Sequence, residues 1–262
     1  MGAFELQHFV CIGAQRAGTS WLYEALKGHP EVYFPVGKEA NVWCIDPHTD
    51  EKSNITYRYC VSRLRGGKHA HRVYKAIGDI SPSYATLGDA GIARLYKTFP
   101  DVKVLYIVRN PVLRAWSALH LSKSLGQFDV DSLDAQGVLK CFGVPSVAEH
   151  GCYAENLARW DRIAGKFGGQ PPKVFVYEEL EKDPLSFICE VADYIGVSSS
   201  YFREVAFRSV KQKTLASGAP ELDPDMLRLA AEFYREDARK LSERLGRDEA
   251  EGLDKVWFES AA

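Results

Sequence analysis

Two short stretches of the sequence combine glycine, arginine and hydroxyl residues in patterns that suit anion binding. The first runs from Gly13 to Trp21, where Gly13 and Gly18 have the spacing of a phosphate-binding loop, G-x-x-x-x-G. Backbone N–H groups of such a loop point inward, and the positive end of the following helix adds to the attraction. A nucleotide triphosphatase has lysine after the second glycine, whereas this chain has Thr19 there and Arg16 as the loop's cation. The loop alone is suggestive, because glycine motifs of this kind often occur by chance.

The second stretch begins at Arg109, directly after a run of β-branched residues, and continues through Pro111 to Ser117. Proline suits the first turn of a helix, so Ser117 is expected about two turns into that helix. Arg109 and Ser117 could then converge on one phosphate, with bidentate binding by the guanidinium. A surface arginine and an ordinary helical serine are the commoner case for any single pair. Two anion sites at neighbouring strand ends indicate a ligand that is phosphorylated at two places.

The elements that must position these residues alternate between strands and helices. Continuous apolar runs predict buried parallel strands, and apolar stripes at helical spacing predict helices. This alternation predicts an α/β fold of three layers, with a central parallel sheet flanked by helices and a P-loop-type phosphate-binding loop after the first strand. Ligands of such sheets bind beyond the carboxyl ends of the strands. The expected strands are 9–12, 73–80, 102–108 and 173–177, and the expected helices are 19–27, 113–124, 153–167, 184–195 and 224–245.

The length and composition fit a single domain over residues 1–262, with two small domains as the alternative. With 46% hydrophobic residues, 26% charged residues and a net charge of -2, neither disorder nor a nucleic-acid partner is expected. We expect no membrane span and no signal peptide, because no apolar run is long enough and the N-terminus lacks a basic and then apolar pattern. Six cysteines without Cys-x-x-Cys spacing argue against a zinc site and favour a cytoplasmic location. Nothing in the sequence indicates an oligomeric state.

Both anion-binding stretches resemble segments of the sulfotransferase family that uses 3'-phosphoadenosine 5'-phosphosulfate (PAPS), and the bacterial and Golgi-type branch in particular. Residues 13–22 are similar to the family's 5'-phosphosulfate loop, and residues 109–117 to its 3'-phosphate segment. The resemblance accounts for two anion sites, since PAPS carries phosphate on both the 5' and the 3' side of its ribose. Weaker similarities cover most of the chain, at 26–30, 38–43, 78–84 and 177–184.

The resemblance implies an enzyme that moves a sulfuryl group from PAPS to a hydroxyl or amine of a small-molecule or glycan acceptor. The product would be 3'-phosphoadenosine 5'-phosphate (PAP). Arg16 replaces the family's usual loop lysine; it keeps the charge but cannot give up a proton, so its expected role is electrostatic. The residues expected to bind the donor are Arg16, Ala17, Gly18, Thr19, Ser20, Trp21, Arg109 and Ser117, with Lys211 and Lys213 as candidates in a basic loop that could equally be a solvated one.

In the expected reaction the acceptor attacks sulfur in line, opposite the leaving phosphate. Arg16, the loop amides and Thr19 would stabilise the developing charge, and no metal is required. The resemblance to glycan sulfotransferases makes Glu39 the first candidate for the general base, a role that suits a carboxylate whose pKa is raised by burial. Asp79, at a strand end, is the second candidate, and Lys38 is a candidate contact of the sulfuryl group. The alternatives are an exposed Lys38–Glu39 ion pair and a turn-capping Asp79.

Two other functions fit the same fold. A P-loop-type kinase would have a phosphate-loop lysine and an acidic magnesium ligand, and Thr19 at the lysine position argues against it. A non-catalytic nucleotide-binding module would bind without turnover; the joint presence of Arg16, Glu39, Arg109 and Ser117 argues weakly against it. The fold alone decides neither case. Acceptor contacts are expected from residues 44–72, which are predicted to be irregular with short helices only, and from residues 126–150, which are predicted to be a surface excursion.

Overall fold

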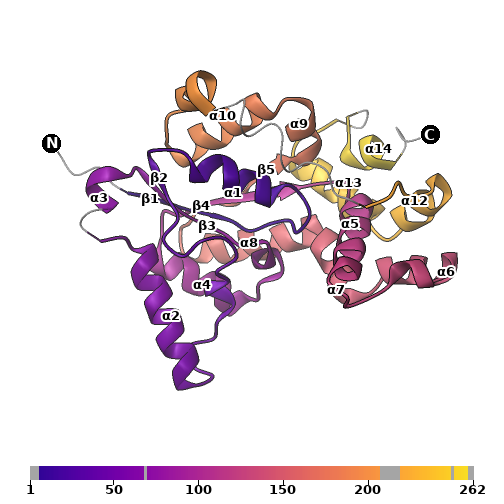
Figure 1. The fold of residues 1–262 in the computed structure, drawn as a ribbon, viewed down its shortest axis with the longest axis horizontal. Helices are drawn as coiled ribbons and strands as arrows, with labels where there is room; N and C mark the ends of the chain where they lie inside the picture. Colours follow the sequence, from indigo (N-terminus) through magenta and orange to yellow (C-terminus); the bar gives the residue numbers. More distant parts are fainter. Residues whose placement is uncertain (1–5, 68–69, 207–218, 249–250, 259–262) are drawn as a thin grey trace. The chain divides into compact units, whose positions relative to one another are not determined.

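The computed structural model describes residues 6–67, 70–206, 219–248 and 251–258. These residues form two compact units (Figure 1). The first unit comprises residues 6–14, 18–107 and 159–206; the second comprises 15–17, 108–158 and the described residues from 219 onward. The chain therefore passes into the second unit within the glycine loop and again at the end of a strand. Among the described residues, no helix is long and apolar enough to cross a membrane.

A five-stranded sheet forms the centre of the first unit, in the order β2-β3-β1-β4-β5. Strand β1 pairs in parallel with β3 and β4, and β2 pairs in parallel with β3. The register sets Cys11 of β1 opposite Ile80 and Leu105, so these strands run toward the same edge of the sheet, as predicted. The strands are β1 (Gln7–Cys11), β2 (Val32–Tyr33), β3 (Ala76–Ile80), β4 (Lys103–Val108) and β5 (Lys173–Val176).

Helices cover both faces of this sheet, which confirms the three-layer α/β prediction (Figure 1). On one face lie α1 (Thr19–Lys27), α9 (Tyr177–Lys182) and α10 (Pro184–Ile195), and on the other lie α4 (Asp89–Thr98) and the C-terminal part of α8 (Tyr153–Lys166). Aromatic contacts join the helices of each face. The rings of Trp21 and Phe187 are 6.1 Å apart on the first face, and those of Tyr96 and Trp160 are 6.3 Å apart on the second.

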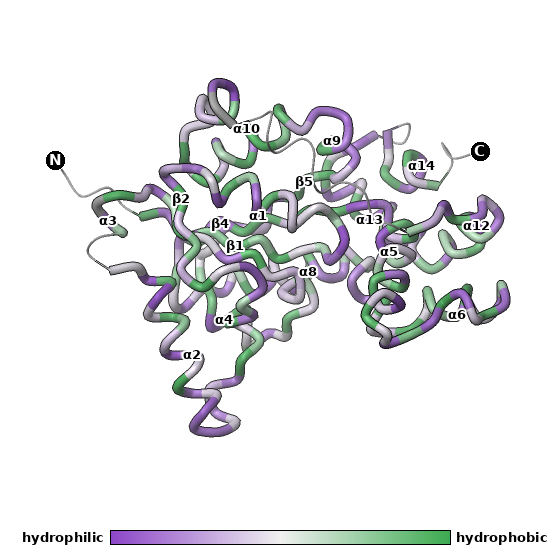
Figure 2. Tube along the Cα trace, viewed as in Figure 1, coloured by the Kyte–Doolittle hydropathy of each residue, from purple (hydrophilic) through white to green (hydrophobic). Residues whose placement is uncertain are grey.

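One long helix of the first unit lies where the sequence predicted irregular structure. Helix α2 (Glu51–Leu64) begins after Asp50, whose side chain accepts a hydrogen bond from the backbone N–H of Ser53. Only Val61 and Leu64 of this helix are buried, and hydrophilic and hydrophobic residues alternate along it (Figure 2). The apolar stripe is therefore too weak to reveal the helix, which depends on its N-cap and on packing of one end.

The second unit is helical. Its helices are α5 (Pro111–Ser124), α6 (Ala135–Phe142), α7 (Pro145–Ala148), the first residues of α8, α12 (Pro224–Ala231), α13 (Arg235–Arg244) and α14 (Leu253–Phe258). The helix expected over 224–245 is interrupted between α12 and α13. At the break Tyr234 is buried, and its hydroxyl donates to the carbonyl of Phe142 at 3.1 Å. The break goes with a contact between distant residues, which the local sequence pattern does not show. Periodicity alone therefore predicted one continuous helix.

Short elements complete the described chain. They are the helix α3 (Ala70–Val73), 3-10 turns at Val42–Cys44, Pro82–Thr86, Val130–Ser132 and Glu149–Gly151, and a π-helical turn at Phe202–Ala206. The turn at Pro82–Thr86 follows β3 directly, and the turn at Val42–Cys44 contacts it. These two turns belong to the segments that the sequence analysis associated with catalysis.

Candidate functional site

The glycine loop is tied to the edge of the sheet where β1 and β4 end. The backbone N–H of Ile107 donates to the carbonyl of Gly13 at 2.8 Å, and the N–H of Ala14 donates to the carbonyl of Ile107 at 2.6 Å. Gly18 ends the loop with φ +85, and a Cβ atom added to it would lie 2.9 Å from Cδ2 of Leu180. Only glycine suits this position, because other residues meet both backbone strain and a clash there. The loop thus leads directly into the N-terminus of α1 at Thr19, a favourable end for an anion.

The side chains at the start of α1 differ in what they offer a ligand. Ser20 is exposed, whereas Thr19 is buried. Trp21 was predicted among the donor-binding residues, but its ring is buried against Phe187 in the core. The indole therefore does not face a ligand, and only the backbone of Trp21 remains for binding.

Arg16, in the middle of the loop, meets both predicted residues of the second anion-binding stretch. Its Nε donates to the Oγ of Ser117 at 2.9 Å. Its carbonyl accepts a hydrogen bond from Nη1 of Arg109, also at 2.9 Å. All three residues belong to the second unit. Arg16 therefore contacts Arg109 through its carbonyl and Ser117 through its guanidinium, and binding of one phosphate by Arg109 and Ser117 stays a prediction.

The start of α5 holds Arg109 and Ser117 in place. Asn110 caps the helix, since its Oδ1 accepts from the backbone N–H groups of Val112 at 3.0 Å and Leu113 at 3.3 Å. Its Nδ2 donates to the carbonyl of Trp257 at 2.8 Å, which fixes the cap against α14. The hydroxyl of Tyr153 donates to the carbonyl of Arg109 at 2.8 Å. These contacts restrain the backbone on both sides of Pro111, so the buried Ser117 is presented from a fixed helix.

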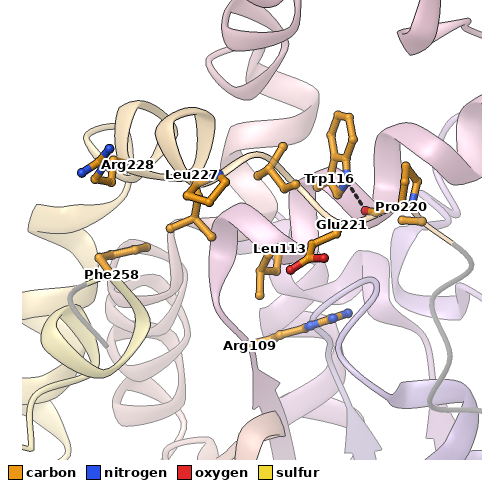
Figure 3. Close-up of a pocket in the computed structure, with 11 residues that line it drawn as sticks. Arg109, Leu113, Trp116, Pro220, Glu221, Leu227, Arg228 and Phe258 are labelled. Carbon is orange, nitrogen blue, oxygen red and sulfur yellow. Dashed lines mark hydrogen bonds between the residues drawn. The ribbon is translucent and has the colours of Figure 1, made fainter. Parts of the chain in front are cut away.

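A cavity of about 570 Å³ in the second unit has Arg109 on its wall. Figure 3 shows Glu221 and Arg109 approaching the same space, with Leu113 beside them. Trp116 donates from Nε1 to the carbonyl of Pro220 at 2.8 Å. Small-molecule sites in proteins are typically roughly 300–1,000 Å³ and mostly apolar, so this cavity is of ligand size. No local sequence pattern reveals this cavity, because its walls come from segments far apart in the chain: Arg109, Leu113, Trp116, 219–222, Pro224, Leu227, Arg228 and Phe258.

Two of the predicted catalytic residues, Lys38 and Glu39, lie in the first unit, on the loop before Val42. Their side chains form an ion pair, and the backbone N–H of Glu39 donates to the carbonyl of Ile80 at 2.9 Å. The Glu39 side chain is 53% exposed and that of Lys38 is 20% exposed. The burial that we expected for a general base is therefore absent from Glu39, and its carboxylate is open to an approaching acceptor.

Asp79, the second candidate base, is completely buried at the end of β3. Its carboxylate accepts hydrogen bonds from Oγ of Ser81 at 2.8 Å and from the hydroxyl of Tyr84 at 2.6 Å. Burial raises the pKa of Asp79 to about 6, against the opposing effect of these two hydrogen bonds. Because an acceptor hydroxyl cannot reach a carboxylate without exposed surface, Asp79 is unsuited to act as the base by direct contact.

The remaining predictions concern a basic loop, a metal ion and the domain organisation. Lys211 and Lys213 lie outside the described residues. In the described ranges, no group of three or more histidine, cysteine, aspartate and glutamate side chains is arranged to hold a metal ion. A mechanism without metal stays a prediction, as does the single-domain organisation.

Comparison with known proteins shows the family to which this glycine loop and its contacts with Arg109 and Ser117 belong. The sequence model of the sulfotransferase domain matches residues 6–259. The chain belongs to the sulfotransferase family. It is an enzyme of the PAPS-dependent class, whose reaction is sulfuryl transfer, and the kinase alternative is not favoured.

Several curated relatives of this sulfotransferase are named heparan sulfate glucosamine 3-O-sulfotransferases. Human heparan sulfate glucosamine 3-O-sulfotransferase 6 is 26% identical over 261 residues, which cover 90% of this chain and 71% of that protein. Mouse heparan sulfate glucosamine 3-O-sulfotransferase 3B1 is 28% identical over 272 residues, covering 94% and 65%. This sulfotransferase thus spans about two thirds of the length of these relatives.

A solved structure shows the same fold. The sulfotransferase from Alicyclobacillus acidocaldarius superimposes on this sulfotransferase with a TM-score of 0.69 and 24% sequence identity, over 97% of this chain and 99% of that one. This agreement supports the described arrangement of sheet and covering helices as the family's architecture.

Proposed function

We propose that this sulfotransferase binds PAPS through Arg16, Arg109 and Ser117 and transfers its sulfuryl group to a hydroxyl or amine of a glycan. The convergence of these three side chains is the observation that supports the proposal most. Arg16 belongs to the loop that resembles a 5'-phosphosulfate site, yet its guanidinium contacts Ser117 of the segment that resembles a 3'-phosphate site. The two predicted phosphate sites are therefore in direct contact, which suits a ligand that carries phosphate on both sides of one ribose.

The neighbouring cavity supports a nucleoside ligand. Arg109 contacts the loop and also lines the cavity. A ligand whose phosphate is held by Arg109 can therefore place its other groups inside the cavity. Apolar side chains such as Leu113 and Trp116 suit a flat heterocycle, and the volume suits a ligand of that size. We assign this cavity to the 3'-phosphoadenosine part of PAPS.

The chemistry follows from the charges. The acceptor atom attacks sulfur, the bond from sulfur to the phosphate oxygen breaks, and PAP leaves with the additional negative charge. Arg16 and the N–H groups at the start of α1 stabilise that charge. Glu39 takes the proton of the acceptor, and the adjacent Lys38 orients the carboxylate through their ion pair. Binding of the acceptor over the open face of Glu39 would then exclude water from it.

The acceptor class follows the relatives' names. We propose a glycan hydroxyl or amine rather than a phenol, because the curated relatives that match nearly the full chain are named for heparan sulfate glucosamine. A cytoplasmic location, predicted from the cysteines, belongs to the same set of proposals.

Two measurements test the proposed function. Calorimetry should show PAP binding that is unchanged by EDTA or added magnesium, and absent binding would overturn the donor assignment. Transfer of labelled sulfate from PAPS should then be compared across glucosamine-containing oligosaccharides, phenols and simple alcohols. Transfer to phenols alone would reject the glycan proposal.

The base assignment has its own comparison. With an active acceptor, Glu39→Gln should lower kcat about 10²- to 10⁴-fold, the usual contribution of general acid–base catalysis. Glu24→Gln is the matched control, since Glu24 is an exposed glutamate that pairs with Lys27 on α1. Equal turnover of the two variants would show that Glu39 is not the base.

A further inference from the structure

Asp79 lies at the centre of a buried hydrogen-bond network that the mechanism above does not use. Asp79, Ser81 and Tyr84 have no exposed surface. The hydroxyls of Ser81 and Tyr84 both donate to the Asp79 carboxylate, at 2.8 and 2.6 Å. A carboxylate can only accept hydrogen bonds, so both hydroxyl hydrogens are directed at it and both oxygens keep lone pairs for other donors.

Those lone pairs face the loop that carries Glu39. The backbone N–H of Asn41 donates to Oγ of Ser81 at 3.2 Å, and the backbone N–H of Trp43 donates to the hydroxyl of Tyr84 at 3.4 Å. Each hydroxyl thus accepts a hydrogen bond from one loop amide and donates a hydrogen bond to Asp79. The two chains of hydrogen bonds begin at one carboxylate and end on two amides that follow Glu39.

The loop requires such support because its backbone is unusual. Glu39 has φ +58 and Asn41 has φ +51, a left-handed region that non-glycine residues adopt only where surrounding contacts hold them. Two more contacts join the same segments: the N–H of Glu39 donates to the carbonyl of Ile80, and Oγ of Ser83 donates to Oδ1 of Asn41. The loop is therefore hydrogen-bonded to the segment at the end of β3 at Glu39 itself and at residues that follow Glu39.

We propose that Asp79 is a positioning residue, which fixes the Glu39 loop in its left-handed conformation through the hydroxyls of Ser81 and Tyr84. This inference rests on the proposed function in one respect, namely that Glu39 is the base whose position matters. Asp79 contacts neither acceptor nor donor in this arrangement. Its carboxylate sets the direction of both hydroxyl hydrogens, and that direction makes the hydroxyl oxygens acceptors for the loop.

The direction of these hydrogen bonds makes Asp79→Asn a sharp test. An asparagine amide would accept from one hydroxyl but donate to the other. The second hydroxyl would then lose the acceptor for its own hydrogen, and its hydrogen bond from the loop amide would be disturbed. We expect faster hydrogen exchange at the amides of Asn41 and Trp43. We also expect kcat to fall about 10- to 100-fold, the size of effect that a misplacement of about 1 Å causes at a reacting centre. PAP affinity should stay unchanged.

A double-mutant cycle separates positioning from a general structural role. If Asp79 acts through Glu39, adding Asp79→Asn to Glu39→Gln should cause little further loss of kcat, because residues that act as one unit are not additive. A full additional loss in the double variant would overturn the proposal. So would Asp79→Asn with unchanged kcat and slow exchange at both amides.

Tyr84→Phe keeps the test decisive if Asp79→Asn does not fold. It removes one hydroxyl from a buried ring and should speed exchange at Trp43 while Asn41, held by Ser81, changes less. Tyr59→Phe, at an exposed tyrosine of α2, should change neither amide. Unchanged exchange at Trp43 in Tyr84→Phe would overturn the proposal. The exchange measurements need no turnover, so they distinguish failure of this inference from failure of the base assignment, which Glu39→Gln alone tests.

Discussion

Nε of Arg16 lies 2.9 Å from Oγ of Ser117, although 101 residues separate them in the sequence. This contact joins a loop that follows β1 to a helix that follows β4, within the second unit. The serine hydroxyl accepts from Arg16 and so keeps its own hydrogen for another acceptor. Two cations and an oriented hydroxyl are thus placed together by the fold itself, which favours tight anion binding by preorganisation.

Removal of the Ser117 hydroxyl should weaken nucleotide binding without disturbing the fold. A hydrogen bond to a charged group contributes about 1.5–3 kcal/mol, so Ser117→Ala should raise the Kd for PAP about 10- to 100-fold in calorimetry. Ser124→Ala is the control on the same helix, since the Ser124 hydroxyl is exposed and donates only to the carbonyl of Leu121. If both variants bind PAP equally well, Ser117 does not contact the nucleotide.

Substitutions of Arg16 should separate its charge from its geometry. Arg16→Lys keeps a cation but lacks the planar fork that reaches Ser117, so we expect partial loss, while Arg16→Ala should lose more in both KM for PAPS and kcat. Arg239→Ala removes an exposed guanidinium that pairs with Glu236 and should leave both constants unchanged. Equal kinetics of Arg16→Ala and Arg239→Ala would contradict an electrostatic role for Arg16.

The parts of the fold that could be predicted from sequence are those with strong local patterns. The run Val102 to Val108 is apolar and β-branched and forms β4, and Thr19 to Lys27, stopped by Gly28, matches α1. The convergence of Arg16, Arg109 and Ser117 was also predictable, because parallel strands bring their carboxyl ends to one edge. A loop after one strand and a helix after its neighbour must then be close.

The parts that could not be predicted depend on contacts between distant residues. The break before α13 accompanies burial of Tyr234 against the segment that ends at Phe142, and no pattern near Tyr234 shows it. From the sequence, Glu39 could be a buried base or part of an exposed ion pair with Lys38, and Asp79 could be a second base or a turn cap. The structure buries Asp79 beside Ser81 and Tyr84 and exposes Glu39 on its loop, an outcome that depends on contacts between these two segments.

The raised pKa of Asp79 predicts a specific dependence of stability on pH. Its pKa is about 6 in the folded chain against 3.8 as the ordinary value, so the folded state holds the proton more tightly. Stability from this residue is full below the unfolded pKa and is lost as pH rises toward and through 6. Relative to Asp79→Asn, the native chain should therefore lose about 2 kcal/mol of unfolding free energy between pH 4.5 and 7.5.

Urea denaturation of both proteins at each pH measures this difference, because the other ionisable groups are common to the pair. The titratable neighbours Tyr84, Cys11, Cys44 and Cys60 have pKa values raised by burial and stay neutral over this range. A difference that is flat with pH would show that Asp79 does not titrate near 6.

The cap of α5 should contribute more to stability than an ordinary helix cap, because Asn110 both caps the helix and donates to a buried carbonyl. Asn110→Ala loses the cap, typically about 1 kcal/mol, and leaves the Trp257 carbonyl unpaired, which costs about 1–3 kcal/mol more. Asn110→Ser keeps a neutral capping oxygen and loses the donor to the Trp257 carbonyl, so its unfolding free energy should be intermediate. Asp223→Ala removes the cap of α12 and serves as the comparison. If Asn110→Ala destabilises the chain no more than Asp223→Ala in urea denaturation, the contact with Trp257 contributes nothing to holding Arg109 at the start of α5.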